Sequence, residues 1–182
     1  MKTNTKQISK FLSLILRHNP GKIGLELDEN GWADVDELIN KTNAYRNQLN
    51  LEIIKEVVAT NDKKRFAFNE DETKIRANQG HSIQVDLEYT PIEPPEFLYH
   101  GTVGKFIEDI RRKGLLKMSR HHVHLSEERE TAMRVGSRRG VSIILTVRSG
   151  EMHRNGIEFY QSDNGVWLTD TVASEYIEFR TK

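Results

Sequence analysis

Arginine stands beside histidine or an aromatic residue at three points where the chain is expected to turn. Arg17 and His18 occur in "LRHNP", Arg65 in "KKRFAF" and Arg120 in "SRHHVH". A guanidinium remains charged at any ordinary pH, and its fork of N–H groups can bind two phosphate oxygens at once. Histidine adds a donor that gains or loses a proton near neutral pH. These residue types suit a site that binds a phosphate and moves a proton beside it.

Arg17 and His18 also have a purely structural interpretation, as the cationic end of a helix. The preceding apolar residues recur at helical spacing: Ile8, Phe11, Leu12, Ile15 and Leu16. Pro20 then prevents the helix from continuing, because proline lacks an N–H and disfavours helical geometry in the residue before it. The helix dipole stabilises a cation in the last turn by about 0.3–1 kcal/mol in any protein. The spacing alone leaves both interpretations open.

The three histidines at 121, 122 and 124 raise the question of a metal site. On a strand, His122 and His124 would share a face, as two ligands of one ion would. A zinc site needs at least a third protein ligand, and the chain has neither an H-E-x-x-H motif nor any cysteine. The lack of cysteine also excludes disulfides and thiolate chemistry. A Ser-His-Asp triad stays open, although no G-x-S-x-G motif favours it. We expect no metal site.

The composition is that of an ordinary globular protein. The chain has 182 residues, of which 36% are hydrophobic and 30% charged, and 27 basic residues balance 27 acidic ones. It lacks an apolar run long enough to cross a membrane, and its first residues, MKTNTKQISK, lack the apolar core of a signal peptide. We expect a cytoplasmic monomer without a membrane partner.

The charge is unevenly distributed along the chain. Residues 105–139 contain ten Lys and Arg but only five Asp and Glu, which gives this segment a charge of +5. Such a patch can recruit phosphate groups, but half of its residues could equally form a solvated helix face.

The elements that must position these residues fall into two modules. The segment "YTPIEPPEF" at 89–97 contains three of the four prolines and predicts a stiff linker. In the first module, the helix that ends near Arg17 is followed by a turn at "DENG" and by helices at "VDELINK" and "LNLEIIKEVVATND". Asp34 and Glu37 have the spacing of a capping box, and "KRFAFNEDETKIRAN" alternates like a β-hairpin. Three helices and a hairpin predict a winged-helix-like unit.

The second module is richer in strands. "EFLYHGT" and "HHVHLS" predict strands that each run into a helix, "VSIILTVRS" predicts a buried strand, and "IEFYQSDNGVWLTD" predicts a hairpin about Asp163–Gly165. Elements in this order predict an α+β fold. Neither the G-x-G-x-x-G motif nor the P-loop spacing is present, so a nucleotide, if one binds, would occupy another kind of cleft.

These segments together resemble a known family. From about Ser9 to Phe179 the chain closely resembles the RNA 2′-phosphotransferase (KptA) family, and the motifs follow in the family's order and spacing: "SKFLSLILRHNPGKIGLELDENGWADVDELI", "VVATNDKKRFAF", "IRANQGHS", "FLYHGT", "HHVHLS" and "NGVWLTDTVASEYI". The resemblance implies a winged-helix-like lobe at 1–90 that binds RNA or phosphate. It also implies an ADP-ribosyltransferase-like lobe at 91–182 that binds NAD.

The implied activity is the removal of an internal 2′-phosphate from RNA, as at the splice junction of a ligated tRNA, with NAD consumed as the acceptor. The phosphate would attack the nicotinamide-bearing ribose carbon of NAD and release nicotinamide. The neighbouring ribose hydroxyl would then attack the phosphorus, which gives 2′-OH RNA and ADP-ribose 1″,2″-cyclic phosphate. Related ADP-ribosyltransferases often have a glutamate in the motif that resembles "NGVWLT", where Val166 stands here. A phosphate is already an anion near neutral pH, so its attack needs no such base.

Carried over by motif, the family's catalytic residues fall on Arg17, His18, Arg65 and Arg120. The three arginines would clamp the 2′-phosphate and stabilise charge in the second step. His18 would donate a hydrogen bond to this phosphate and protonate the departing RNA oxygen. The alternatives to a catalytic role are that Arg65 is a charged residue on the surface of a strand and that Arg120 is an ordinary cation of a loop.

The family's NAD-binding motifs fall on seven residues: His100, Gly101, Thr102, His124, Ser126, Gly136 and Arg138. Gly101 would let the backbone approach the ligand, and Thr102 and Ser126 would offer hydroxyls. The histidines of this set could instead be satisfied core residues. Arg139 is left unassigned, because relatives often have histidine there. His81 and Ser82 of "QGHS" match the family, but the sequence gives them no role.

Two other classes of function stay open. A winged-helix RNA-binding protein with a degenerate catalytic lobe would bind RNA without consuming NAD. An ADP-ribosyltransferase that stops after the first step would leave a stable ADP-ribosylated product. The complete set of four catalytic residues favours the full reaction over both.

Overall fold

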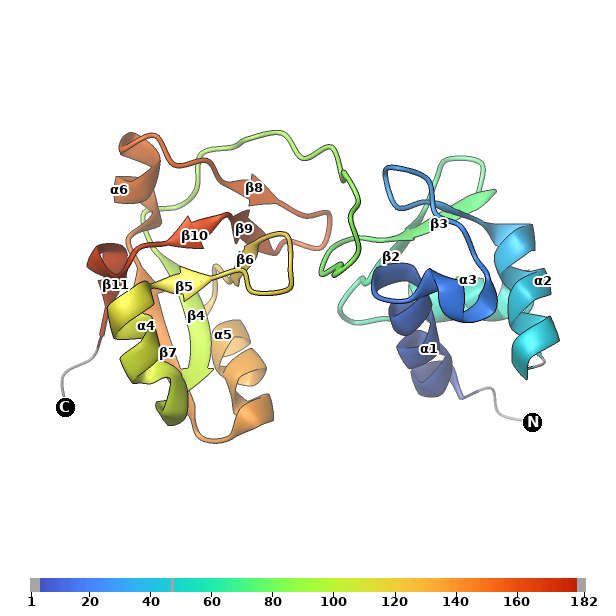
Figure 1. The fold of residues 1–182 in the computed structure, drawn as a ribbon, viewed down its shortest axis with the longest axis horizontal. Coiled ribbons are helices and arrows are strands. Elements are labelled where there is room, and N and C mark those ends of the chain that lie inside the picture. Colours follow the sequence, from blue (N-terminus) through green and yellow to red (C-terminus); the bar gives the residue numbers. More distant parts are fainter. Residues whose placement is uncertain (1–3, 47, 180–182) are drawn as a thin grey trace. The chain divides into compact units, whose positions relative to one another are not determined.

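The computed structural model describes residues 4–46 and 48–179 of the chain. The chain divides into two compact units, Met1–Glu88 and Tyr89–Lys182, and the second unit begins with the proline-rich segment at 89–97. Each unit has its own helices, small antiparallel sheets and hydrophobic core (Figure 1). This mixture is compatible with the predicted α+β class. The outer ends of the two predicted lobes, residues 1–3 and 180–182, lie outside the described residues.

The first unit combines helices with a three-stranded sheet. Its elements are α1 (Thr5–Arg17), η1 (Pro20–Ile23), β1 (Ala33–Asp34), α2 (Val35–Arg46), α3 (Leu51–Ala59), β2 (Phe66–Phe68) and β3 (Lys74–Ala77). Strand β3 lies between β1 and β2 and is antiparallel to both, with Phe66 opposite Ala77 and Ala33 opposite Ile75. The predicted helices and hairpin are therefore present, although α3 is shorter than the segment "LNLEIIKEVVATND" predicted.

The buried face of α1 determines where its last residues lie. Leu12, Ile15 and Leu16 are completely buried, and they pack with apolar residues of α3 and of the sheet. Full burial of such a side chain contributes about 1.5–3 kcal/mol. The rotation of α1 about its axis is therefore well defined, which fixes the place of Arg17 at its C-terminal end.

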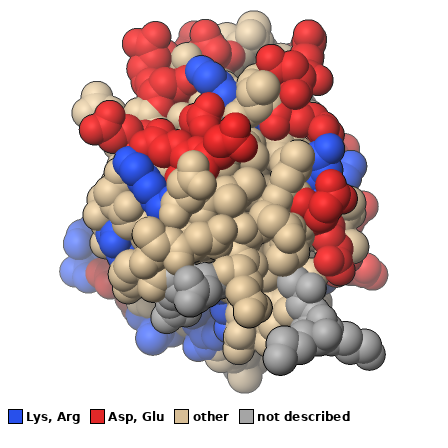
Figure 2. Space-filling view, turned by 90° about the vertical axis from the view of Figure 1, so that its right-hand side faces the viewer, with Lys and Arg blue, Asp and Glu red and all other residues tan. Residues whose placement is uncertain are grey.

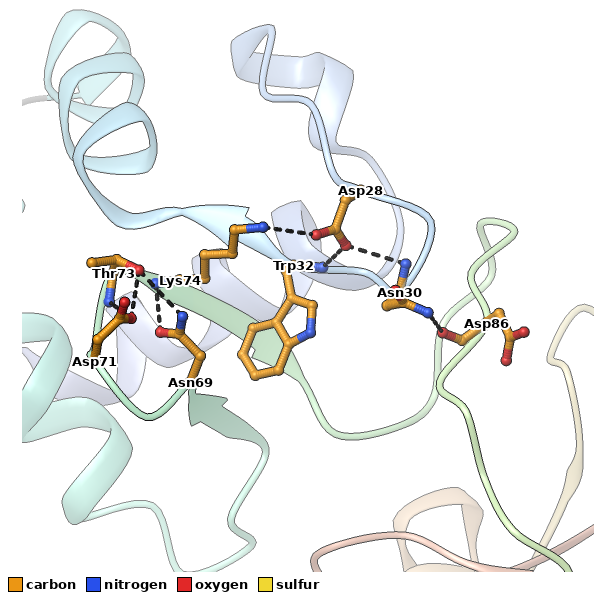
Figure 3. Close-up of polar contacts among 8 residues, drawn as sticks. All are labelled: Asp28, Asn30, Trp32, Asn69, Asp71, Thr73, Lys74 and Asp86. Atoms are coloured by element: carbon orange, nitrogen blue, oxygen red, sulfur yellow. Dashed lines mark hydrogen bonds and ion pairs between the residues drawn. The ribbon is translucent and has the colours of Figure 1, made fainter.

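Short polar side chains shape the turns of the first unit (Figure 3). Oδ1 of Asp28 accepts the backbone N–H of Asn30 at 3.1 Å, and its Oδ2 lies 3.2 Å from Nζ of Lys74 in β3. Oδ1 of Asp34 accepts the backbone N–H of Glu37 at 2.8 Å, which is one half of the predicted capping box. Asp and Asn favour turns because their side chains can bond to nearby backbone in this way.

The second unit contains three small antiparallel sheets. Its elements are β4 (Leu98–Val103), η2 (Gly104–Phe106), α4 (Ile107–Lys113), β5 (Leu115–Leu116), β6 (Val123–Leu125), α5 (Arg129–Gly136), η3 (Ser137–Arg139), β7 (Ser142–Val147), α6 (Ser149–Arg154), β8 (Tyr160–Gln161), β9 (Trp167–Thr169), β10 (Thr171–Val172), η4 (Ser174–Tyr176) and β11 (Ile177–Glu178). The strand orders are β11-β7-β4, β6-β9-β8 and β10-β5. The predicted strands and the β8–β9 hairpin are present. The sequence does not predict α6, because six residues are too few to show a helical period.

The core of the second unit supports the strands that carry the predicted NAD-binding motifs. Leu98 of β4 and Leu125 of β6 are buried together with Leu145, Met152 and Phe159. Helix α5 lies against β4 and β7 (Figure 1). Both motif strands are thus held on a packed scaffold, which suits residues that must keep a defined geometry.

Charge is segregated on the surface seen from the right-hand side of Figure 1. Figure 2 shows carboxylates gathered toward the top of this face, an uncharged centre, and Lys and Arg mainly at the margins. Among the described residues in this view, basic side chains form no continuous track.

Candidate functional site

Arg17 and Arg65 meet in the first unit, although they are 48 residues apart in the sequence. Arg17 is the last residue of α1, and Arg65 directly precedes β2. Nη2 of Arg17 donates a hydrogen bond to the carbonyl oxygen of Arg65 at 3.4 Å, and its guanidinium carbon lies 5.9 Å from the ring centroid of Phe66. The half-buried Arg17 side chain thus lies against the start of β2, beside the second predicted arginine.

An asparagine links the Arg65 side chain back to α1. Nη1 of Arg65 donates to Oδ1 of Asn61 at 3.2 Å, and Nδ2 of Asn61 donates to Oγ of Ser9 at 3.0 Å. The sequence does not predict this role, because an asparagine after a helix usually serves only the local turn. Asn61 therefore connects the Arg65 side chain to the helix that carries Arg17.

His18 lies one residue beyond α1, where the chain leaves helical geometry. Its backbone N–H still bonds to the carbonyl of Leu14 at 3.1 Å, whereas Asn19 has φ −151°, as expected before Pro20. The exposed imidazole places Nδ1 2.9 Å from Oγ of Ser82. Arg17 and His18 therefore end the helix and also contact the segments that carry Arg65 and Ser82. The interpretation of "LRHNP" as a helix end and its interpretation as part of a phosphate-binding site do not exclude each other.

The remaining predicted catalytic residue, Arg120, belongs to the second unit and precedes β6. Its Nη1 lies 3.3 Å from Nδ1 of His124. Partial burial lowers the pKa of the Arg120 guanidinium, and the positive charges of Arg139 and Arg138 lower it further. The clustering of Arg120 with these two positive charges favours an anion as a ligand.

His100 of β4 is held in one tautomer. Its Nδ1 lies 3.1 Å from the backbone carbonyl oxygen of His124, which can only accept, so Nδ1 carries a proton. Burial lowers the pKa of His100, the hydrogen bond to His124 opposes this, and the charge of Arg120 lowers the pKa again. The imidazole is therefore neutral near pH 7, with Nε2 as an acceptor for a hydroxyl or amino group.

The "HGT" and "HLS" motifs lie side by side in the second unit. Tyr99 of β4 and Ser126, which follows β6, exchange two backbone hydrogen bonds of 2.8 Å. Because side chains alternate along a strand, His100 and the buried Thr102 lie on one face of β4, opposite the face of Gly101. The structure thus brings the two predicted NAD-binding motifs together.

Gly101 and Gly136 allow α5 to approach β4 closely. A Cβ at Gly101 would lie 1.8 Å from the carbonyl oxygen of Ala132, and a Cβ at Gly136 would lie 2.4 Å from Oγ of Ser142. At Gly101 the obstacle is backbone, so the packing of α5 by itself requires glycine there, whereas at Gly136 the nearest atom belongs to the Ser142 side chain. The Cβ side of Gly101 is therefore filled by α5, and the approach of its backbone to NAD stays a prediction. Arg138, two residues beyond Gly136, is exposed.

His122, one of the three histidines considered for a metal site, has aromatic neighbours. The ring of His122 lies 6.2 Å from that of Tyr89 and 5.5 Å from that of Tyr160, measured between centroids, and burial lowers its pKa. In the described residues, no group of three or more His, Asp or Glu side chains is arranged to hold a metal ion.

The same arrangement of motifs occurs in proteins of a known family. The model for "RNA 2'-phosphotransferase, Tpt1 / KptA family" matches residues 3–171. The chain belongs to the Tpt1/KptA family. A "Probable RNA 2'-phosphotransferase" of Flavobacterium johnsoniae is 65% identical over 176 residues, which cover 97% of each chain. Proteins of the same name from Burkholderia pseudomallei and Escherichia coli are 55% identical over 171 residues (94% and 93% of the two chains) and 49% identical over 182 residues (98% and 99%).

Membership of the Tpt1/KptA family confirms the resemblance seen in the sequence motifs. The matched range contains every position predicted to act in catalysis or in NAD binding, and it extends over both units. In the part of the chain that the structure describes, no helix is long and apolar enough to span a membrane.

Proposed function

We propose that this protein transfers an internal 2′-phosphate from RNA to NAD and releases 2′-OH RNA, nicotinamide and ADP-ribose 1″,2″-cyclic phosphate. Membership of the Tpt1/KptA family supports the general activity, that of an RNA 2′-phosphotransferase. The observation that carries the proposal further is the meeting of Arg17 with Arg65 beside His18. Arginine and histidine are the residue types that can bind a phosphate and transfer a proton to one of its ester oxygens.

In this mechanism Arg17, His18, Arg65 and Arg120 act on the 2′-phosphate. The phosphate is the nucleophile of the first step and is already an anion, so Val166 in place of an acidic residue is compatible with that step. The arginines orient its oxygens, which converts attack into an intramolecular event.

The second step places a heavier demand on the arginines. A ribose hydroxyl attacks the phosphorus, the bond from phosphorus to the RNA 2′-oxygen breaks, and that oxygen must gain a proton. The arginines stabilise the negative charge that gathers on the phosphoryl oxygens. His18 supplies the proton, since it directly follows Arg17 and an imidazole can act as a general acid.

The residues of the second unit fit NAD as a co-substrate. NAD supplies the electrophilic ribose carbon and the nicotinamide leaving group. Nε2 of the neutral His100 accepts a hydrogen bond from a ribose hydroxyl or the carboxamide, and Ser126 adds a hydroxyl nearby. The positive cluster of Arg120, Arg138 and Arg139 suits the negative charge of a pyrophosphate.

The fold assignments belong to the same proposal. The helices and β2–β3 hairpin of the first unit support a winged-helix-like lobe, and the helices and small antiparallel sheets of the second unit support an ADP-ribosyltransferase-like lobe. We also propose a monomeric, cytoplasmic enzyme that acts on tRNA-like substrates.

The test is incubation of the protein with a synthetic RNA that carries one internal 2′-phosphate, with and without NAD. Mass spectrometry of both products should detect 2′-OH RNA and ADP-ribose 1″,2″-cyclic phosphate only when NAD is present. Accumulation of ADP-ribosylated RNA alone would show an enzyme that stops after the first step. RNA binding without any turnover would show a binding protein and refute the proposal.

A further inference from the structure

The five residues 78–82 contact both parts of the arginine pair. Ser82 donates its backbone N–H to the carbonyl of Arg17 at 2.9 Å, and its Oγ lies 2.9 Å from Nδ1 of His18. At the other end, Asn78 donates its backbone N–H to the carbonyl of Arg65 at 2.9 Å. A single short segment, directly after β3, is thus bonded to three of the residues that the proposed reaction uses.

The Asn78 end of this segment supports an unusual backbone conformation. Nδ2 of the buried Asn78 donates to the carbonyl of Lys64 at 2.7 Å. Lys64 has φ +40°, a left-handed conformation that is unfavourable for a residue with a side chain. The hydrogen bond stabilises this turn, which directs the next residue, Arg65, toward Arg17.

The Ser82 end is anchored by packing. The side chain of His81 is only 2% exposed, and its Nε2 would lie 3.5 Å from a Cβ built on Gly31. Shortly beyond, Asp86 donates its backbone N–H to the carbonyl of Glu29 at 2.7 Å. The buried His81 and the backbone hydrogen bond of Asp86 hold the chain on both sides of Ser82, so Ser82 cannot easily follow a movement of the His18 ring. It can therefore impose an orientation on the exposed imidazole.

We infer that Ser82 is a positioning residue, which holds the imidazole of His18 through Nδ1 so that Nε2 is the nitrogen that serves the phosphate. This inference rests on the proposed function, and it assigns a role to Ser82 of the "QGHS" motif. When Nε2 gives its proton to the departing RNA oxygen, the neutral ring must keep its proton on Nδ1. Oγ of Ser82 accepts that N–H, so the hydrogen bond favours the product tautomer and aims Nε2.

The contact also explains why a serine is suited to this place. A hydroxyl accepts from Nδ1–H both before and after Nε2 gives up its proton, so it remains bonded to the ring throughout the proton transfer. A carboxylate would add a negative charge beside the phosphate-binding arginines. Ser82 therefore orients His18 without opposing the binding of an anion.

The test uses Ser82→Ala, which keeps the backbone N–H to Arg17 and removes only the hydroxyl. Ser82→Thr retains the hydroxyl, and Ser82→Cys keeps the side-chain size with a much weaker hydrogen bond. Gln84→Ala, at an exposed position of the same loop, is the matched control. Each variant is assayed as the full chain, first by the ¹⁵N chemical shifts of the His18 ring and then by single-turnover rates of both chemical steps.

In the wild type, the neutral ring of His18 should carry its proton mainly on Nδ1. Ser82→Ala and Ser82→Cys should shift this ring toward a mixture of tautomers and slow the second step about three- to tenfold, the equivalent of one lost hydrogen bond. The first step and RNA binding should change little, and Ser82→Thr and Gln84→Ala should behave as the wild type does.

An unchanged His18 tautomer in folded Ser82→Ala and Ser82→Cys overturns the inference, as does equal slowing of both steps. The ¹⁵N measurement needs no substrate, so it tests the positioning role even if the wild type shows no turnover. That last result would instead refute the proposed function. The two failures are therefore distinguishable.

Discussion

Replacing Arg17 by alanine separates a helix-ending residue from a phosphate ligand, because the two roles predict losses of different size. In the folded protein, the contacts of Arg17 include one long hydrogen bond of 3.4 Å, a distant contact with the Phe66 ring and a favourable position in the helix dipole. Together these contribute about 1–2 kcal/mol to stability. A residue with only this role should be dispensable for turnover.

As a phosphate ligand, Arg17 would make two charge-assisted hydrogen bonds, each worth about 1.5–3 kcal/mol. The sum of about 3–6 kcal/mol corresponds to two to four orders of magnitude in rate, at 1.36 kcal/mol per tenfold, if the loss falls on the transition state. The second step should suffer more, because the phosphorus itself is attacked there and its oxygens gather charge. We expect Arg17→Ala to accumulate ADP-ribosylated RNA.

The assay follows a labelled RNA through both steps in a single turnover and resolves substrate, ADP-ribosylated RNA and 2′-OH product. Lys10→Ala is the matched control, since it removes one positive charge from an exposed position of the same helix. Arg17→Lys, which keeps the charge without the two-pronged geometry, should fall between alanine and the wild type. A folded Arg17→Ala protein that forms 2′-OH RNA at close to the wild-type rate would refute the assignment and leave Arg17 as a helix end.

Three further predictions concern metal dependence, pH and packing. Turnover should survive EDTA, because no step of the proposed mechanism uses a metal ion; loss of activity that zinc or magnesium restores would contradict that mechanism. The lowered pKa of the buried His100 means that the unfolded state binds a proton more readily than the folded state, so the free energy of unfolding should decrease as the pH falls through about 6.5, the ordinary histidine pKa. Urea unfolding from pH 8 to pH 5 should show this slope, and His100→Asn should flatten it; an equal slope in both proteins would argue against a buried neutral imidazole. Gly101→Ala should lower the free energy of unfolding by about 1–3 kcal/mol, since its Cβ would collide with the Ala132 carbonyl, whereas Gly104→Ala, with only Cδ1 of Ile143 at 4.0 Å, should be nearly neutral in the same urea titration.

Much of the local structure could be predicted from the sequence, because it depends on residues that are close together in the chain. The apolar period from Ile8 to Leu16 predicts α1, and Pro20 predicts its end, since these effects act within one or two helical turns. The β2–β3 hairpin follows from alternation about an acidic turn. The family motifs likewise identified the candidate site residues before any contact was known, and their assignment to a reaction stays a prediction.

Contacts between distant segments had no such local signal. The bond from Arg17 to the Arg65 carbonyl, the pairing of His18 with Ser82 and the closeness of Gly101 to Ala132 each depend on how a whole core packs. Core packing is the sum of many weak contacts, and no short pattern encodes the position that results. The sequence by itself therefore determined which residues could bind a phosphate and where the chain turns. Only the tertiary structure decided that Ser82 adjoins the imidazole and that α5 packs against Gly101.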